Sequence, residues 1–230
     1  MVVMSSTPPL GRRVLAEFVG TAALAAVVIG SGIAAQTLSP GDVGLQLLEN
    51  SLATALGLAV IIVVLAPVSG AALNPVVTLV AQPLGARDSV RTVLGYVVAQ
   101  IAGALGGAVL ANAMFGLAPA VSTTARVTVG TALAEVVATA GLVMVIFGLI
   151  RSGRASAVPA AVGAYIGAAY WWTSSTSFAN PAITIGRIIT ESFAGIEPLS
   201  AIVFLAAQLI GATIGGVLVV ALFPRKPAVA

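Results

Sequence analysis

Long apolar stretches separated by short polar connections dominate the hydropathy pattern of this chain. A helix needs about 20 mostly apolar residues to cross the hydrocarbon core of a bilayer. The stretches that meet this requirement are roughly Val14–Ala35, Asn50–Pro67, Val90–Phe115, Thr128–Ile150, Ala157–Thr173 and Leu199–Phe223. The pattern therefore predicts an all-α membrane protein with six transmembrane helices.

Two shorter apolar segments remain, and each begins at an Asn-Pro pair. One runs from Asn74 to Leu84 and the other from Asn180 to Ile189. About ten residues are too few to span a bilayer, whereas Asn favours the position before a helix and Pro favours its first turn. We therefore expect two re-entrant half-helices. The alternative is an amphipathic surface loop, which length alone does not exclude.

The composition agrees with a membrane protein and narrows the chemistry. Hydrophobic residues make up 59% of the chain and charged residues 7%, against roughly a quarter charged in an average soluble domain. The chain has no His and no Cys, which removes imidazole and thiolate chemistry, disulfides and the common transition-metal ligands. A net charge of +3 is too small for a nucleic-acid surface. We expect no catalytic residues, no metal site, no cofactor and no nucleic-acid partner.

The basic residues predict the orientation in the membrane. Cytoplasmic loops of membrane proteins are enriched in Lys and Arg. On one side of the predicted spans lie Arg12, Arg13, Arg87, Arg91, Arg151, Arg154, Arg225 and Lys226. The opposite loops hold Arg126 and Arg187. Both termini are therefore expected to be cytoplasmic, in agreement with an even number of spans.

The chain, read as a single domain over residues 1–230, repeats itself in two halves, 1–120 and 121–230. The same marks follow in the same order: Glu17 and Glu135, then residues 74–78 and 180–184, then Gln100, Gly103, Gly107 and Gln208, Gly211, Gly215. Three spans per half make the second half enter the membrane from the other side. This arrangement is an inverted repeat with a pseudo-two-fold axis in the membrane plane.

Glu17 and Glu135 are the carboxylates that lie well inside predicted spans. An intramembrane carboxylate is a candidate functional group, and a proton relay is one reading. Each half also has one re-entrant loop whose backbone N–H groups need acceptors. Two symmetric carboxylates suit two symmetric loops, so we expect both residues to brace these loops. The Gly pairs should let helix backbones approach closely.

Three elements of the chain resemble those of the aquaporin, or major intrinsic protein, family. They are residues 16–21 (Ala-Glu-Phe-Val-Gly-Thr), residues 69–75 (Ser-Gly-Ala-Ala-Leu-Asn-Pro) and the Asn-Pro-Ala box at 180–182. The resemblance implies six helices, two half-helices that meet head to head at mid-membrane, and a homotetramer with one pore per chain. It places the pore boxes at Asn74, Pro75, Val76, Asn180, Pro181 and Ala182. Transport would be passive, with the two Asn amides facing a neutral solute and the half-helix dipoles repelling cations.

Departures from the family pattern bear on the solute. Water- and glycerol-conducting members carry an Arg directly after the second box, where this chain has Ile183. The resemblance places the other filter positions at Leu56, Ala168 and Ser177, of which the first two depend on gap placement. The implied filter is wide and apolar. Arg187 lies one helical turn beyond Ile183, so we expect it to line the outer vestibule. The alternative is a solvated or headgroup-paired Arg.

The run of hydroxyl residues from Thr173 to Ser177, together with Ile183, is similar to aquaporin-type proteins associated with bacterial arsenic resistance. This similarity implies a bacterial plasma-membrane channel for arsenite as As(OH)3, methylated arsenicals and glycerol. A plain water channel is the nearest alternative. A secondary transporter also has inverted repeats, although no third charged side chain lies mid-span to bind a coupling ion. A membrane enzyme is disfavoured by the absence of His and Cys.

Overall fold

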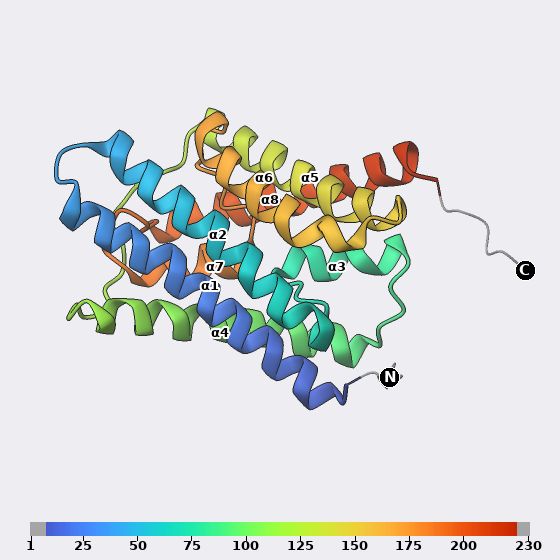
Figure 1. Cartoon of the computed structure of the whole chain (residues 1–230). Coiled ribbons are helices and arrows are strands. Elements are labelled where there is room, and N and C mark those ends of the chain that lie inside the picture. The colour runs from blue at the N-terminus through green and yellow to red at the C-terminus, as the bar shows by residue number, and fades with distance from the viewer. Residues whose placement is uncertain (1–7, 225–230) are drawn as a thin grey trace, which may run out of the picture.

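A computed structural model of the chain describes residues 8–224, and every regular element within them is helical. Six long helices surround two short ones (Figure 1). The long helices are α1 (Leu10–Leu38), α2 (Val43–Ser69), α4 (Val90–Met114), α5 (Val129–Arg151), α6 (Val158–Trp172) and α8 (Pro198–Leu222). The short helices are α3 (Pro75–Leu84) and α7 (Pro181–Gly186), with single 3-10 turns at Ala155–Ala157 and Arg187–Ile189.

The lengths of three elements differ from the sequence-based expectation. Helix α2 begins at Val43 rather than Asn50, because the side chain of Asp42 accepts a hydrogen bond from the Leu45 N–H (2.9 Å) and caps the helix. Helix α6 has 15 residues, fewer than the other five apolar helices that are long enough to span a membrane. A 3-10 turn precedes it and supplies the rest of the predicted span. Helix α7 ends at Gly186, where the chain tightens into a second 3-10 turn.

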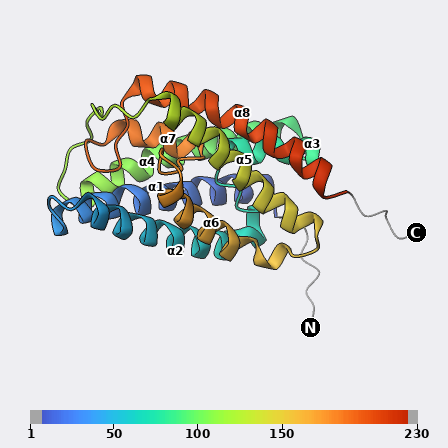
Figure 2. The same cartoon turned by 90° about the horizontal axis from the view of Figure 1, so that it is seen from above.

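Glycines allow the closest contacts between helices, once in each half of the chain. Helix α1 packs along α4, and α5 packs along α8 (Figure 2). A Cβ added to Gly107 would overlap the carbonyl of Ala22, and one added to Gly215 would lie 2.6 Å from the carbonyl of Ala140. Packing this close needs residues without a side chain. The two pairs of helices are related as the inverted repeat predicts.

The beginning of α1 and the end of α8 lie at the same end of the bundle (Figure 1). Two side-chain contacts place further elements at this end. Arg13 at the start of α1 forms an ion pair with Asp88 in the connection between α3 and α4 (2.7 Å), and Arg151 at the end of α5 donates to the carbonyl of Phe223 after α8 (2.8 Å). The predicted group of basic residues surrounds it, namely Arg12, Arg13, Arg87, Arg91, Arg151 and Arg154. Arg225 and Lys226, which complete that group, lie outside the described residues.

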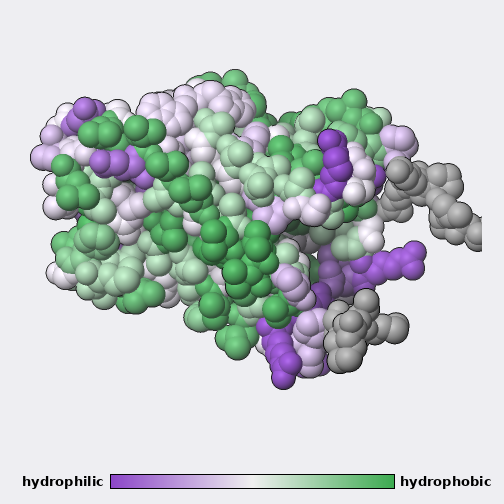
Figure 3. Space-filling view, viewed as in Figure 1, coloured by the Kyte–Doolittle hydropathy of each residue, from purple (hydrophilic) through white to green (hydrophobic). Residues whose placement is uncertain are grey.

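The surface of the bundle is apolar around its middle. Figure 3 shows hydrophobic residues across the central part of the visible face and hydrophilic residues gathered towards its ends. Large exposed apolar side chains include Leu52, Val60, Val64, Leu94 and Leu209. In water such a surface would drive aggregation, whereas in lipid it needs no cover. The fold is therefore that of a multi-pass membrane protein.

Candidate functional site

The two Asn-Pro pairs each begin a half-helix. The side chain of Asn74 accepts a hydrogen bond from the Val76 N–H (3.1 Å), and that of Asn180 accepts from the Ala182 N–H (3.0 Å). These bonds satisfy N–H groups that have no partner within a helix. Pro75 and Pro181 occupy the first turn, where no N–H is needed. The two remaining box residues, Val76 and Ala182, are buried in the same hydrophobic core.

Each Asn also reaches across to the loop of the other half. The Nδ2 atom of Asn74 donates to the carbonyl of Ala179, and that of Asn180 donates to the carbonyl of Leu73, both at 2.8 Å. The half-helices α3 and α7 therefore meet at their N-termini. An amide group carries two N–H donors, so each Asn keeps one that is free to face a solute. Both Asn side chains line the internal cavity.

The loops that lead into the half-helices hold an unusual backbone conformation. Ala71 and Leu73 in the first loop have φ values of 48° and 50°, and Ser177 and Ala179 in the second have 49° and 45°. This left-handed conformation is strained for residues with a Cβ. It turns the carbonyls of Leu73 and Ala179 towards the opposite Asn. Something outside the loops must therefore hold them.

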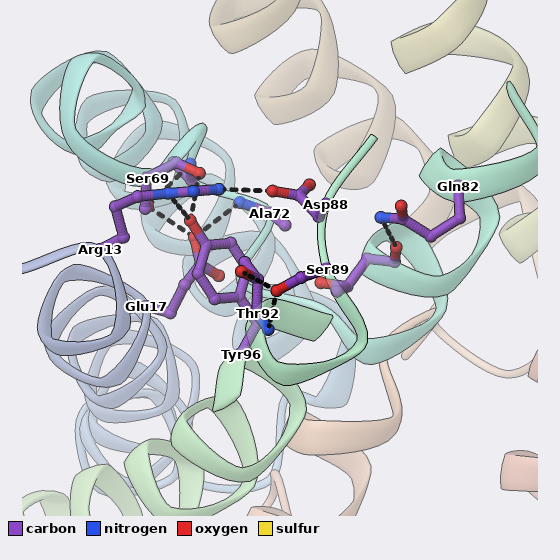
Figure 4. Close-up of polar contacts among 11 residues, drawn as sticks. Arg13, Glu17, Ser69, Ala72, Gln82, Asp88, Ser89, Thr92 and Tyr96 are labelled. Carbon is purple, nitrogen blue, oxygen red and sulfur yellow. Dashed lines mark hydrogen bonds and ion pairs between the residues drawn. The ribbon is translucent and has the colours of Figure 1, made fainter. Parts of the chain in front are cut away.

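The buried carboxylate of Glu17 holds the first loop. It accepts hydrogen bonds from the Ala72 N–H (3.1 Å), the Leu73 N–H (2.7 Å) and the hydroxyl of Ser69 (2.6 Å). The contacts to Ser69 and Ala72 are visible in Figure 4. Gln100 on α4 adds a bond to the same carboxylate (2.7 Å). These bonds satisfy the loop N–H groups and fix the charged acceptor.

Glu135 does the same for the second loop. It accepts from the Phe178 N–H (2.8 Å) and the Ala179 N–H (2.9 Å), and Gln208 on α8 donates to it at 2.7 Å. Gln208 also donates to the hydroxyl of Thr184 on α7 (2.9 Å). The two halves thus repeat one hydrogen-bonded scaffold. Glu17 accepts four hydrogen bonds from this scaffold and Glu135 accepts three.

One continuous cavity of about 250 Å³ runs past the meeting point of the half-helices. Asp88 and Tyr96 line one end, and Arg187 lines the other. These ends are far apart, because Asp88 pairs with Arg13 at the start of α1, whereas Gln36 at the end of α1 contacts the loop beside Arg187. Between them the wall is mostly apolar and includes Leu24, Val28, Leu58, Ile62, Leu142 and Ile166. We refer to the two ends as the Asp88 end and the Arg187 end.

The expected filter residues fall into two groups. Ser177 and Ile183 line the cavity near its Arg187 end. The prediction that Leu56 and Ala168 belong to the filter is wrong. Both are exposed on the outer surface (61% for Leu56), and neither lines the cavity. A shift of two residues turns a helical side chain by about 200°. On α2 and α6, the residues two positions away from Leu56 and Ala168 face the cavity instead.

Thr54 on α2 and Tyr170 on α6 take these places. Their hydroxyl groups lie 3.2 Å apart, and both side chains line the cavity. The buried Oγ of Ser177 has no hydrogen-bond partner in the described part of the chain. The Arg187 end therefore combines the apolar side chain of Ile183 with several hydroxyl groups. A Thr and a Tyr within apolar helices are polar signals that sequence reasoning could have used.

Arg187 is buried, with 3% of its surface exposed, and it lines the cavity. Its Nε donates to the carbonyl of Ala194, and its guanidinium lies 3.4 Å from the centre of the Phe178 ring. The alternative of a solvated or headgroup-paired Arg is therefore wrong. Its charge lies about one helical turn beyond Ile183.

A polar cluster that sequence reasoning missed lies at the Asp88 end (Figure 4). Arg13 pairs with Asp88 and also donates to the hydroxyl of Tyr96 (2.8 Å). Tyr96 in turn donates to the carbonyl of Ser69 (2.9 Å). The cluster joins the start of α1 to the loop before α3. The sequence carries one signal for this cluster, because Arg13 lies about one helical turn before Glu17 and so on the same face of α1.

The described residues offer no obvious place for a metal ion. Within residues 8–224, no three acidic side chains gather into a group that could hold one. Between its Asp88 end and its Arg187 end, the cavity offers amide N–H groups and hydroxyls within an apolar wall. Such a wall suits an uncharged solute that exchanges hydrogen bonds as it moves.

Two half-helices meet inside a six-helix bundle, beside a cavity that is lined by residues from both ends of the bundle. This arrangement defines a membrane channel built on an inverted repeat. The Major intrinsic protein family matches residues 4–177 of this chain. The chain therefore belongs to the Major intrinsic protein family.

Individual relatives agree with this assignment. Aquaglyceroporin AqpS of Rhizobium meliloti (strain 1021) is 47% identical over 205 residues, covering 88% of this chain and 86% of the relative. Lens fiber major intrinsic protein of Gallus gallus is 30% identical over 238 residues, covering 95% and 84%. Among solved structures, the aquaglyceroporin from Plasmodium falciparum shares the fold, with a TM-score of 0.74 at 20% identity over 94% of this chain and 98% of that one.

Proposed function

We propose that this protein is a passive channel for small neutral hydroxylated solutes, with glycerol and arsenous acid, As(OH)3, as its first substrates. The observation that carries the proposal is the Arg187 end of the cavity. Ile183 stands where water- and glycerol-conducting members carry an Arg, and the hydroxyls of Thr54, Tyr170 and Ser177 line the same region. The similarity to a relative named an aquaglyceroporin supports a solute larger than water.

The hydroxyl groups suit a solute that displays several hydroxyls of its own. A neutral triol can exchange its hydration shell for these groups and for the free N–H of Asn74 and Asn180. The apolar wall opposite them removes water without offering competing bonds. Arsenous acid and glycerol each present three hydroxyls and carry no net charge. Methylated arsenicals present fewer hydroxyls and more apolar surface, which the Ile183 side of the filter accommodates.

The same features disfavour ions. Both half-helices direct their positive N-terminal ends at the middle of the cavity, and Arg187 adds a positive charge near one mouth. The carboxylates of Glu17 and Glu135 accept loop N–H groups and are not available for a coupling ion. We therefore infer transport down the gradient of the solute, with no cofactor and no coupled ion.

We further infer that the channel lies in the bacterial plasma membrane as a homotetramer with both termini cytoplasmic. The basic residues around the end where α1 begins and α8 ends support this orientation. The tetramer rests on the family resemblance. Cross-linking in membranes and protease protection of a terminal tag test both inferences, and a monomeric protein or an externally cleaved tag would contradict them.

Stopped-flow light scattering on proteoliposomes tests the transport proposal. Vesicles without any ion gradient are exposed to inward gradients of glycerol, arsenous acid or an impermeant osmolyte. Glycerol and arsenous acid should enter faster than in protein-free vesicles, and flux should rise linearly with the gradient. Movement of water alone would contradict the wide filter. Solute uptake that requires a sodium or proton gradient would instead indicate a secondary transporter.

A further inference from the structure

Two guanidinium groups from different parts of the chain share one aromatic ring at the Arg187 end. Arg187 follows α7, and its guanidinium lies 3.4 Å from the centre of the Phe178 ring. Arg126, from the connection between α4 and α5, lies 5.6 Å from the same ring. A cation above an aromatic face is attracted to the ring, but two like charges in one place repel each other. The pair therefore needs further compensation.

Carbonyl groups supply part of that compensation. Arg126 donates to the carbonyls of Gly195 and Phe193, both at 2.6 Å, and Arg187 donates to the carbonyl of Ala194. Three consecutive carbonyls thus face the two cations. These oxygens carry partial charges only, so the net charge of the pair remains +2. Arg126 is partly buried, and this desolvation lowers the pKa of its guanidinium from the usual value.

Carboxylates near this end are engaged elsewhere. Glu191 accepts from the backbone N–H and hydroxyl of Thr123 (2.6 and 3.0 Å), and Glu197 accepts from Ser200 (2.8 Å). Within residues 8–224 the ion pair found between side chains is the one between Arg13 and Asp88, at the opposite end of the cavity. Within residues 8–224 neither Arg126 nor Arg187 forms an ion pair, and the nearest charge that attracts Arg187 is the buried carboxylate of Glu135, which is bonded to the loop N–H groups.

Arg187 also keeps donors that face the cavity. The hydrogen bond found for its side chain within residues 8–224 is the one from Nε to the carbonyl of Ala194, and the side chain is buried and lines the cavity. A guanidinium presents paired N–H groups in the geometry that binds a carboxylate or a similar planar oxyanion. The unpartnered hydroxyl of Ser177 lines the same end.

We propose that the Arg187 end is a binding site for a small monovalent oxyanion, such as a short carboxylate, which is held by Arg187 and blocks the passage of neutral solute. Arg126 contributes charge and holds the carbonyl loop in place. The bound anion does not traverse the channel, because the apolar wall beyond the filter offers no replacement for its hydration. The site would let the concentration of small anions on one side set the flux of the neutral solute.

Formate is the probe for this site, and gluconate is the matched control, because gluconate carries the same charge on a much larger body. Glycerol flux is measured in proteoliposomes equilibrated with either sodium salt on both sides, at constant ionic strength and osmolarity. Formate near its dissociation constant should occupy half of the sites and lower glycerol flux about twofold, in a saturable manner. Gluconate should leave the flux unchanged. Glycerol flux without formate tests the transport proposal on which this assay rests, whereas its response to formate tests the anion site.

Variants assign the effect to one residue. Arg187→Gln should lose the response to formate, and Arg151→Gln, which removes an Arg near the opposite end, should keep it. A measurement on the wild-type protein covers the case in which Arg187→Gln fails to fold. Formate, but not gluconate, should raise the unfolding temperature in detergent to a plateau. Equal effects of the two salts on flux and on unfolding temperature, or a formate response that survives in Arg187→Gln, would overturn the proposal.

Discussion

Replacing Glu135 with Gln tests whether a buried carboxylate holds the second re-entrant loop. The carboxylate accepts from two backbone N–H groups, those of Phe178 and Ala179, and from the amide of Gln208, at 2.7–2.9 Å. Gln keeps the shape of the side chain but replaces one acceptor oxygen with a donor. At least one of the three donors then loses its partner and faces another N–H group.

The size of the effect follows from these contacts. A hydrogen bond to a charged group contributes about 1.5–3 kcal/mol, and leaving a buried donor without a partner costs about 1–3 kcal/mol. Removing the charge returns part of this loss, since a buried carboxylate pays for its desolvation. We expect a net loss of about 2 kcal/mol in the free energy of unfolding, from the balance of these terms. Because the loop carries Ser177 and positions Asn180, glycerol flux should fall about tenfold or more, the factor that corresponds to 1.4 kcal/mol.

Denaturant titration in mixed micelles measures the first quantity, and stopped-flow glycerol uptake measures the second. Glu197→Gln is the matched control, because this carboxylate is only partly buried and accepts from the hydroxyl of Ser200 (2.8 Å). It should change the free energy of unfolding by no more than about 0.5 kcal/mol. If Glu135→Gln unfolds at the wild-type denaturant concentration and conducts glycerol at the wild-type rate, the bracing role is refuted.

Two further substitutions probe packing and the filter. Gly107→Ala should prevent the close approach of α4 to the Ala22 carbonyl and destabilise the protein by about 1–3 kcal/mol in the same titration. Gly106→Ala is the control, because its added Cβ would lie 3.9 Å from the nearest side-chain atom, and it should not destabilise the protein. Equal stability of the two variants would contradict the packing argument. Thr54→Val keeps the volume of the side chain but removes the hydroxyl that faces Tyr170. Arsenous acid flux should therefore fall severalfold while water flux is retained. An unchanged ratio of arsenous acid flux to water flux would exclude the hydroxyl pair from the filter.

The sequence was most informative where one residue type recurs in both halves. Asn74 and Asn180 could be placed at the ends of half-helices because Asn and Pro have strong positional preferences, and the repeat supplied an internal check. Glu17 and Glu135 could be assigned to the loops because a carboxylate inside an apolar span needs donors. In each case the chemistry of the residue restricts its surroundings.

The rotation of α2 and α6 could not be predicted in the same way. Both helices are apolar on nearly every face, so their hydropathy does not say which side faces the cavity. Leu56 and Ala168 were placed by alignment to a family pattern, and an error of two residues turned each to the outer surface. Nor could the sequence pair Arg126 with Phe178, because that contact depends on how the connection between the two halves folds back over the mouth.

The central claim is that the residue at position 183 sets the solute, and the ratio of arsenous acid to water permeability tests it most directly. Stopped-flow measurements on proteoliposomes would compare the wild type with Ile183→Arg and with the control Ile183→Leu, which keeps an apolar side chain of similar volume. We predict a high ratio for the wild type and for Ile183→Leu, and a ratio at least about tenfold lower for Ile183→Arg, equivalent to 1.4 kcal/mol. An Ile183→Arg channel that passes arsenous acid and water in the wild-type ratio would contradict the account.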